Sequence, residues 1–462
     1  MNTLFPRSLR DRELMRTIFH LAWPTVMEQA LQTIVQYVDT AQVGRIGANA
    51  SAAVGLTSTT TWLVNAPLWA AAMGVLSCVS RALGAQDEPR ARRAAAQSVV
   101  LTLVMGAAMT VLTLAASPFL PGWLGAEEDI YRDAAVYFGI ICAPMLFRAA
   151  SIIFAAVLRA VGDTRTPMAV NVGMNLCNVT LNFLLINPPG VWHIGGTAVS
   201  IPGAGLGVTG AAIATAASFV LGGTLMTVFA FHAPKLQLGK QPPRYDRVAM
   251  GQCLDVGLPI AADRVIVMLG QVVFTGLVAG LGTMAVAAHT IALTAEQAFY
   301  IPGYGMQAAA ATLAGYSIGG KDEKKLMEYS FVISAIAVVL MTTLSVFLFL
   351  FPEHIMSIFT PDSRVIAMGG QVLRIVALSE PFFAVVIILE GTFQGVGDVR
   401  APFLISVSCM WGVRLVSTWV CVNLLHLDLN AVWWCMVADN MSRFALLLHR
   451  YRGRRWRGAL YE

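Results

Sequence analysis

Long apolar stretches alternate with short polar connections along the whole chain. Each stretch has about 20 residues or more, enough for a helix to cross a hydrocarbon core of about 30 Å. Six lie in each half, at 17–42, 52–80, 93–117, 131–158, 167–187 and 207–232, and at 249–279, 285–316, 327–351, 366–394, 402–425 and 429–449. We therefore predict an all-α integral membrane protein with twelve transmembrane helices. Since 57% of residues are hydrophobic and 12% are charged, the composition also excludes a soluble domain of this size.

The two halves repeat each other at an offset of 235 residues without a gap. The offset pairs Pro24 with Pro259, Gly47 with Gly282, Pro67 with Pro302, Gly84 with Gly319 and Asp87 with Asp322, and it pairs Gly162-Asp163-x-Arg165-x-Pro167 with Gly397-Asp398-x-Arg400-x-Pro402. This register predicts two pseudo-symmetric six-helix lobes, 1–233 and 248–462, joined by a polar linker at 234–247. Secondary transporters use such repeats to build a site that opens to either side of the membrane.

Positive charge lies on one side of the predicted spans. Lysine and arginine gather in the N-terminal segment, in alternate connections, in the central linker and in the tail, whereas the opposite connections hold Arg45, Arg132 and Arg364. Excess positive charge stays in the cytoplasm during insertion, so both termini and the linker are expected there, in a bacterial inner membrane. The start of the chain shows no cleavable signal peptide. Topology explains the basic charge without a nucleic-acid partner.

Acidic residues inside the spans need either a partner or a function, because charge at bilayer depth is unfavourable. Asp39 is the first candidate, and Glu28, which precedes it by 11 residues, falls on nearly the same helical face. The repeat places Glu28 opposite Asp263 but Asp39 opposite Phe274, so the two lobes are expected to do different work.

The second half carries its own acids at membrane depth. They are Asp263, Glu296 and Glu390, with Glu380 near a helix entry before Pro381. Each is a candidate for binding a proton or a cationic solute, since desolvation penalises the ionised carboxylate. The alternative for each acid is a buried ion pair, and the available cations are Arg264, Arg374, Arg414 and Arg443.

Four asparagines form a ridge in the fifth span. Asn171, Asn175, Asn178 and Asn182 are spaced by 4, 3 and 4 residues, which puts them on one helical face. Turned inward, the ridge would share hydrogen bonds with Asp39 or offer amide oxygens to Na⁺; the alternative is hydrogen bonding between helices. A functional role is favoured for Asn178 and Asn182.

Prolines within spans predict kinks. Pro67, Pro144 and Pro302 lie in span interiors, where proline removes a backbone hydrogen bond. Such kinks suit gating, although a static packing kink explains each proline equally well. Pro24 and Pro259 lie in the first helix of each lobe.

Several other classes of site are excluded. Gly205-x-Gly207-x-x-Gly210 has the spacing of a dinucleotide fingerprint, but no strand precedes it and a membrane span follows. The seven cysteines are isolated, no phosphate-binding loop is present, and no nucleophile–base or metal constellation indicates an enzyme. We therefore expect no cofactor and a transport cycle driven by an ion gradient.

The chain resembles the multidrug and toxic compound extrusion (MATE) family, in its NorM-like branch, from about Ala22 to the tail. The resemblance rests on Leu21-Ala-Trp-Pro24, Val38-Asp39, Val43-Gly44-x-x-Gly47, Ser80-Arg-Ala-Leu-Gly84-Ala, Tyr316-Ser-Ile-Gly319-Gly, Gly257-Leu-Pro259, Gly282-x-x-Ala285-x-Ala287-Ala288-His289, Ile301-Pro302-Gly303, Arg443 and Gly453-x-x-Trp456. It implies a monomeric antiporter that expels amphipathic, mostly cationic organic compounds in exchange for Na⁺ or H⁺.

The resemblance also implies a cation site in the first lobe. The family's positions match Asp39, Asn178, Asn182 and Thr215, and Asp39, Asn178 and Asn182 would be the Na⁺ ligands if Na⁺ is the coupling ion. Some branches have Asp where this chain has Asn182, so Asp39 is the lobe's one strong acid. Asp263 is the best match to the family's acid in helix 7, and the lobes would rock about the helices that carry Pro24 and Pro259.

A flippase for lipids or lipid-linked sugars is the alternative transport function. Such cargo carries pyrophosphate, which calls for a cluster of cationic residues. The basic residues within the spans are Arg148, Arg264, Arg374, Arg414 and Arg443. Whether they cluster or disperse distinguishes the two functions.

Overall fold

The computed structural model describes residues 11–44, 46–194, 197–201, 203–236, 238–240, 245–454 and 456. The chain divides into two compact units. The first-half unit comprises Ala30–Val75 and Glu88–Leu254, and the second-half unit comprises Met1–Gln29, Leu76–Asp87 and Asp255–Glu462. The unit boundaries fall inside three long helices, so parts of the first two helices belong with the second half.

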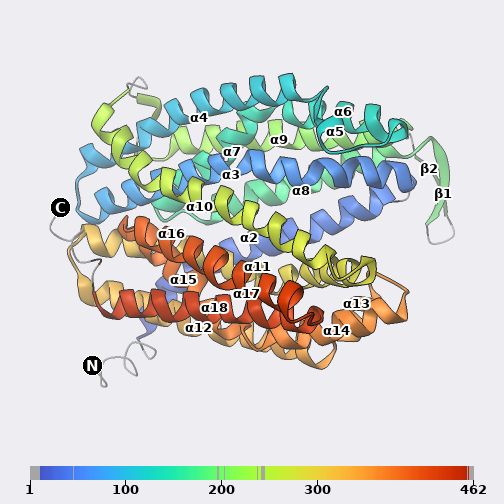
Figure 1. The fold of residues 1–462 in the computed structure, drawn as a ribbon. Helices are drawn as coiled ribbons and strands as arrows, with labels where there is room; N and C mark the ends of the chain where they lie inside the picture. Colours follow the sequence, from blue (N-terminus) through green and yellow to red (C-terminus); the bar gives the residue numbers. More distant parts are fainter. Residues whose placement is uncertain are drawn as a thin grey trace. The chain divides into compact units, whose positions relative to one another are not determined.

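The first half of the chain is helical apart from one hairpin (Figure 1). Its helices are α2 (Arg12–Gly44), α3 (Ala48–Gly84), α4 (Glu88–Ala116), α5 (Leu120–Trp123), α6 (Glu128–Cys142), α7 (Met145–Ala160), α8 (Arg165–Ile186), α9 (Gly207–His232) and the 3₁₀ turn η1 (Leu238–Lys240). The hairpin, β1 (Gly190–Ile194) paired antiparallel with β2 (Thr197–Ile201), joins α8 to α9. The sequence analysis did not predict it, because its residues fall in a connection between spans.

The second half is helical throughout its described residues. Its elements are α10 (Arg247–Ala279), α11 (Thr283–Gly319), α12 (Glu323–Leu350), α13 (Pro352–Ser357), α14 (Ser363–Ala377), α15 (Glu380–Val396), α16 (Arg400–Val407), the π-helical η2 (Ser408–Leu415), α17 (Val416–Trp419), the π-helical η3 (Val420–Leu424) and α18 (Leu429–Arg452). The start of α2 packs into this unit, where Leu14, Ile18 and Leu21 join a buried cluster with residues of α11, α12 and α15.

The helices confirm the twelve predicted spans. Seven helices are long and apolar enough to cross a membrane, and the bent pairs α6–α7 and α14–α15 pass the same test as single spans. The remaining three, α2, α11 and α18, have 33, 37 and 24 residues and are long enough, but they carry more polar side chains. Those three helices hold Asp39, Glu296 and Asp439 among their polar side chains.

The proline kinks divide into two cases. At Pro144 the span breaks between α6 and α7, which are bent by 49°. At Pro24, Pro67, Pro259 and Pro302 the helix continues through the proline. Their gating role stays a prediction. The linker expected at 234–247 lies partly outside the described residues, and the proposed lobe limits also stay a prediction.

The repeated Gly-Asp-x-Arg-x-Pro motif has diverged in its contacts. Asp163 accepts hydrogen bonds from the backbone N–H and the hydroxyl of Thr166, at 3.0 and 2.6 Å, and so fixes the start of α8. Its counterpart Asp398 receives two hydrogen bonds of 2.9 Å from the guanidinium of Arg450. The second half has Ala401 at the position of Thr166, so no hydroxyl is present to bond there.

Candidate cation-binding site

The four residues expected to bind the coupling cation converge within the first-half unit. The amide nitrogen Nδ2 of Asn182 donates to Asp39 Oδ1 at 2.7 Å and to Asn178 Oδ1 at 3.2 Å. Asn178 Nδ2 lies 3.2 Å from the hydroxyl of Thr215. The side chains come from α2, α8 and α9, and Asn178 and Asn182 are buried. The site therefore gathers a carboxylate, two amides and a hydroxyl at one point.

The two amides of this cluster can offer oxygen atoms to a cation. Asn182 Oδ1 is buried and has no hydrogen-bond partner among the described residues. If the Asn178 amide is turned over, its nitrogen donates to Asp39 Oδ1 and Oδ2 at 2.7 and 3.1 Å, while its oxygen accepts from Thr215. In the other orientation the Asn178 oxygen lies against the Asp39 carboxylate, an arrangement that a cation or proton between them would stabilise. Because hard cations prefer oxygen ligands, the unpartnered oxygen and the adjustable amide suit a cation beside Asp39.

The other two members of the asparagine ridge lie outside the cluster. Asn171 donates to the carbonyl of Pro167 at 2.9 Å, a bond within its own helix. Asn175 has a buried Nδ2 with no partner in the described part of the chain. The ridge therefore combines two residues that meet Asp39 with two that do not.

An apolar layer lies one helical turn beyond the site. Val43 follows Asp39 by four residues, Ile186 follows Asn182 by four, and Ala211 precedes Thr215 by four. These three side chains, with Ala50 and Val208, form one buried hydrophobic cluster. Since residues four apart stack on the same helical face, the cluster covers the polar site at the end where α2 and α8 finish and α9 begins.

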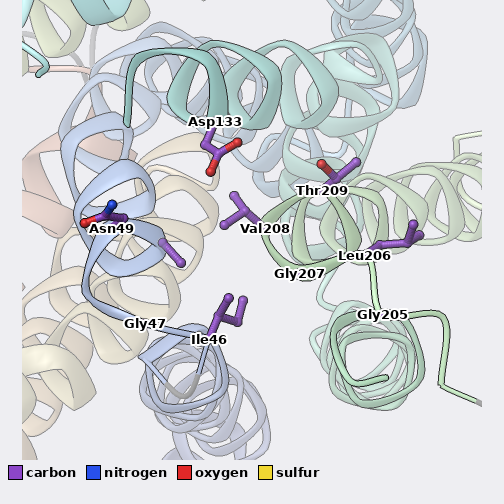
Figure 2. A pocket seen from close by; sticks show the side chains of 10 residues that line it. Ile46, Gly47, Asn49, Asp133, Gly205, Leu206, Gly207, Val208 and Thr209 are labelled. Carbon is purple, nitrogen blue, oxygen red and sulfur yellow. The ribbon is translucent and has the colours of Figure 1, made fainter. Parts of the chain in front are cut away.

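A cavity of about 510 Å³ opens on the other side of that layer. Its lining includes Ala50 and Val208 of the apolar layer, together with Asn49 and Asp133. Figure 2 shows Asp133 and Val208 directed toward the space between α6 and the start of α9. The remaining lining residues are Ile46, Gly47, Gly205, Leu206, Gly207 and Thr209. Gly205 and Gly207, excluded above as a nucleotide fingerprint, have φ of +65° and +55° and turn the chain into α9.

The equivalent place in the second half contains a guanidinium. The 235-residue offset replaces Asp39 by Phe274, which is fully buried, and Asn178 by Val413. Arg414, next to Val413 on η2, lies over the Phe274 ring at 5.6 Å from the ring centre. The second half thus places the guanidinium of Arg414 where the first half has the Asp39 carboxylate. This difference in charge is the asymmetry between the lobes that the sequence led us to expect.

Arg414 and Arg443 share an acid that the sequence analysis did not single out. Asp439 lies 2.7 Å from Arg414 Nη2 and 3.0 Å from Arg443 Nε, and it is fully buried. Arg443 Nη1 also donates to Ser406 Oγ at 3.0 Å. The spacing of four residues between Asp439 and Arg443 was the available signal, because it places both on one face of α18.

The predicted second-half acids fall into two environments within their unit. Asp263 and Glu390 interact electrostatically with Arg264 and Arg443, and for both acids the ion-pair alternative stays a prediction. Arg264 also lies over Tyr304, 5.9 Å from the ring centre. Glu296 is buried on α11 and interacts electrostatically with Arg414. Glu28 is buried in this same unit, so the structure assigns it to a different unit from Asp39.

Several known proteins with similar sequences are named as multidrug resistance proteins. A probable multidrug resistance protein NorM of Thermotoga maritima is 29% identical over 449 residues, which cover 96% of this chain and 93% of that protein. The multidrug resistance protein PmpM of Pseudomonas aeruginosa is 25% identical, with 88% of this chain and 84% of that protein covered.

Solved structures share the fold. A MOP superfamily transporter from Pyrococcus furiosus, described by the reverse polarity of its binding pocket, superposes with a TM-score of 0.87 at 22% identity, covering 99% of this chain and 98% of that one. An outward-facing multidrug resistance MATE family transporter gives 0.86 at 23% identity, covering 99% and 98%. These likenesses establish the two-lobed, twelve-helix architecture.

The MatE family model matches the chain twice, at residues 24–184 and 259–420. The two matches begin at Pro24 and Pro259, which the internal repeat makes equivalent. Together they cover more than half of the chain and include helices from both lobes. The protein therefore belongs to the MatE family of membrane transporters.

Proposed function

We propose that this protein is an antiporter that exports amphipathic, mostly cationic compounds in exchange for Na⁺ or H⁺. The names of its relatives support multidrug export. The coupling step is supported by one observation: Asp39, a carboxyl group at membrane depth, meets two buried amides and a hydroxyl, and one amide oxygen there has no partner.

The chemistry of this site favours exchange of a small cation. An ionised carboxylate away from water is unfavourable unless a positive charge or a proton neutralises it. Asn182 keeps Asp39 in place through its 2.7 Å hydrogen bond. When a cation arrives, the Asn178 amide can turn its oxygen inward, and Thr215 can follow with its hydroxyl oxygen. When the cation leaves, the amide nitrogens again donate to the carboxylate.

We infer that the second half contributes a fixed cation and not a second exchange site of the same kind. Arg414 holds its charge permanently, and Asp439 fixes it at 2.7 Å. Cation exchange at a carboxylate held by amides would then concern the first lobe, while the helices that carry Pro24 and Pro259 let the lobes move. Both termini and the linker would lie in the cytoplasm, the protein in a bacterial inner membrane, and the working unit would be a monomer.

The membrane arginines already interact with other protein groups, which disfavours a pyrophosphate-linked cargo. Asp439 contacts both Arg414 and Arg443, Glu353 pairs with Arg374 at 2.8 Å, and Arg264 interacts with Glu390 and Asp263. Arg148, in the other unit, lies over the Phe219 ring at 4.4 Å. A flippase site would need several unpaired cations together, and the described residues contain no such group.

Transport in liposomes tests the proposal. Purified protein is reconstituted with a fluorescent organic cation, and a pH gradient and a Na⁺ gradient are imposed separately. We expect one gradient to drive export and Asp39→Asn to abolish the coupling. If neither gradient moves the cation, or if Asp39→Asn transports normally, the proposed function is wrong.

A further inference from the structure

Both halves interrupt the same span at the same point. In the first half the break lies between α6 and α7, with a bend of 49°, and in the second between α14 and α15, with a bend of 57°. The offset of 235 pairs Pro144 with Ser379 and Met145 with Glu380. Interrupted helices at corresponding positions of two repeats mark binding sites in transporters. Only the second half places an acid there.

Glu380 is enclosed and unpartnered. Its side chain is 1% exposed, and neither carboxyl oxygen has a hydrogen-bond partner among the described residues. The charge that acts on it comes from Glu296 of α11, itself 6% exposed. Two buried carboxyl groups therefore act on each other electrostatically in the interior of the second-half unit.

The surrounding groups do not neutralise this pair. Arg414 acts on Glu296, but its guanidinium already contacts Asp439 at 2.7 Å. Tyr300 of α11 interacts electrostatically with both glutamates, but its hydroxyl is uncharged and supplies no positive charge. His289, further along α11, is held between the rings of Phe274 and Trp433 at 5.3 and 5.7 Å.

The N-terminus of α15 stabilises an ionised Glu380 less than a counter-ion would. Glu380 is the first residue of α15, where the helix dipole favours an anion. That contribution is smaller than the unfavourable free energy of an unpaired buried charge, to which the repulsion from Glu296 is added. A cation would need several oxygen ligands around Glu380, whereas a proton needs one oxygen.

We propose that Glu296 and Glu380 form a second protonation site, in which the pair holds one proton at neutral pH. The proton gives the pair the hydrogen-bond donor that two carboxylates lack. It is taken from water as one H⁺ onto a carboxyl oxygen and is returned the same way. The site is separate from Asp39 and does not depend on which solute is exported.

Infrared difference spectroscopy of the whole protein tests this site. Protonated carboxyl groups give a carbonyl-stretch band that carboxylates lack, and ¹³C labelling of all glutamates shifts the glutamate bands away from that of Asp39. At neutral pH we expect a protonated glutamate band that Glu380→Gln removes. In Glu296→Gln the band should keep its intensity but move in frequency, because its hydrogen-bond partner has changed.

Two controls isolate the pair. Glu353→Gln, which removes a half-exposed partner of Arg374, should leave the band unchanged, and so should Asp39→Asn. The absence of a protonated glutamate band in the unaltered protein, which needs no variant, would overturn the proposal; so would a band that survives Glu380→Gln. Failure of cation coupling in the liposome assay would leave the band untouched, so the two proposals fail independently.

Discussion

Gly84 and Gly319 occupy the same position in the two repeats, and each lies against the partner helix in the same way. A Cβ atom at Gly84 would collide with the carbonyl of Tyr316, and one at Gly319 would collide with the carbonyl of Arg81. Arg81 and Tyr316 are themselves related by the offset of 235. The ends of α3 and α11 thus cross about a local two-fold axis within the second-half unit, as in a symmetric dimer interface.

Valine at either glycine should separate these two helix ends. Overpacking of a close contact costs about 1–3 kcal/mol, enough to change the ratio of two conformations by about tenfold. In a cysteine-free background, Ala85→Cys with Gly320→Cys should form a disulfide readily, and adding Gly84→Val should lower its yield. Gly276→Val is the control, because a Cβ there meets nothing within 4 Å. An unchanged yield in Gly84→Val would show that the crossing adjusts without opening.

Substitutions of Asn182 and Asn175 can be compared directly, because both residues lie on α8. Asn182→Leu removes the donor to Asp39, and a hydrogen bond to a charged group contributes about 1.5–3 kcal/mol. Because this bond stabilises the ion-free carboxylate, its loss should raise the apparent affinity for a coupling proton roughly ten- to a hundredfold. If Na⁺ is the coupling ion, its affinity should fall instead, because the substitution also removes the unpartnered amide oxygen of Asn182. Asn175→Leu should change either affinity little, because its buried nitrogen has no partner in the described chain. The half-saturating cation concentration in liposomes measures both. Equal effects of the two substitutions would mean that the whole asparagine ridge, and not Asn182 alone, sets the cation affinity of Asp39.

Removing side-chain volume from the apolar layer should expose the cation site around Asp39 to the cavity beyond that layer. Ile186→Ala removes volume between Asn182 and the cavity that Asp133 lines, and we expect cation flux without organic substrate to rise. Ile153→Ala in α7 is the control: it is equally apolar and fully buried, and either change costs about 2–5 kcal/mol of stability. Flux is measured in liposomes without cargo. A leak in both variants would indicate general loosening, and a leak in neither would show that the layer does not limit access.

Asp439 should matter for stability more than any surface acid. Asp439→Asn leaves two buried guanidiniums unpaired, and breaking such a pair costs about 3–5 kcal/mol. The apparent unfolding temperature in detergent should drop clearly, whereas Glu353→Gln, at a half-exposed pair, should change stability by about 1 kcal/mol or less. Replacing Asp439, Arg414 and Arg443 together by Leu and Met should recover most of the loss. Tolerance of Asp439→Asn alone would mean that water already reaches the guanidiniums.

Features that depend on the residues of a single helix could be predicted from the sequence. The apolar stretches located the twelve spans, and the asparagine spacing placed Asn178 and Asn182 on one face. Thr215 came from the family resemblance, because a single threonine in an apolar span has no periodic signal of its own. Asp439 was missed for a related reason: its importance depends on Arg414, a residue on a different helix.

The amino-acid sequence by itself determined the membrane environment, the duplicated six-helix plan and the identity of Asp39 as a lone acid, because hydropathy, repeat register and helical periodicity are local properties of a chain. Only the tertiary structure decided which charges meet. It placed Asp439 against two arginines, put Arg414 over Phe274 and buried Glu380, without a counter-ion among the described residues, near the charge of Glu296. Those pairings depend on packing between helices far apart in sequence, where a difference of a few ångströms separates an ion pair from an isolated carboxyl group.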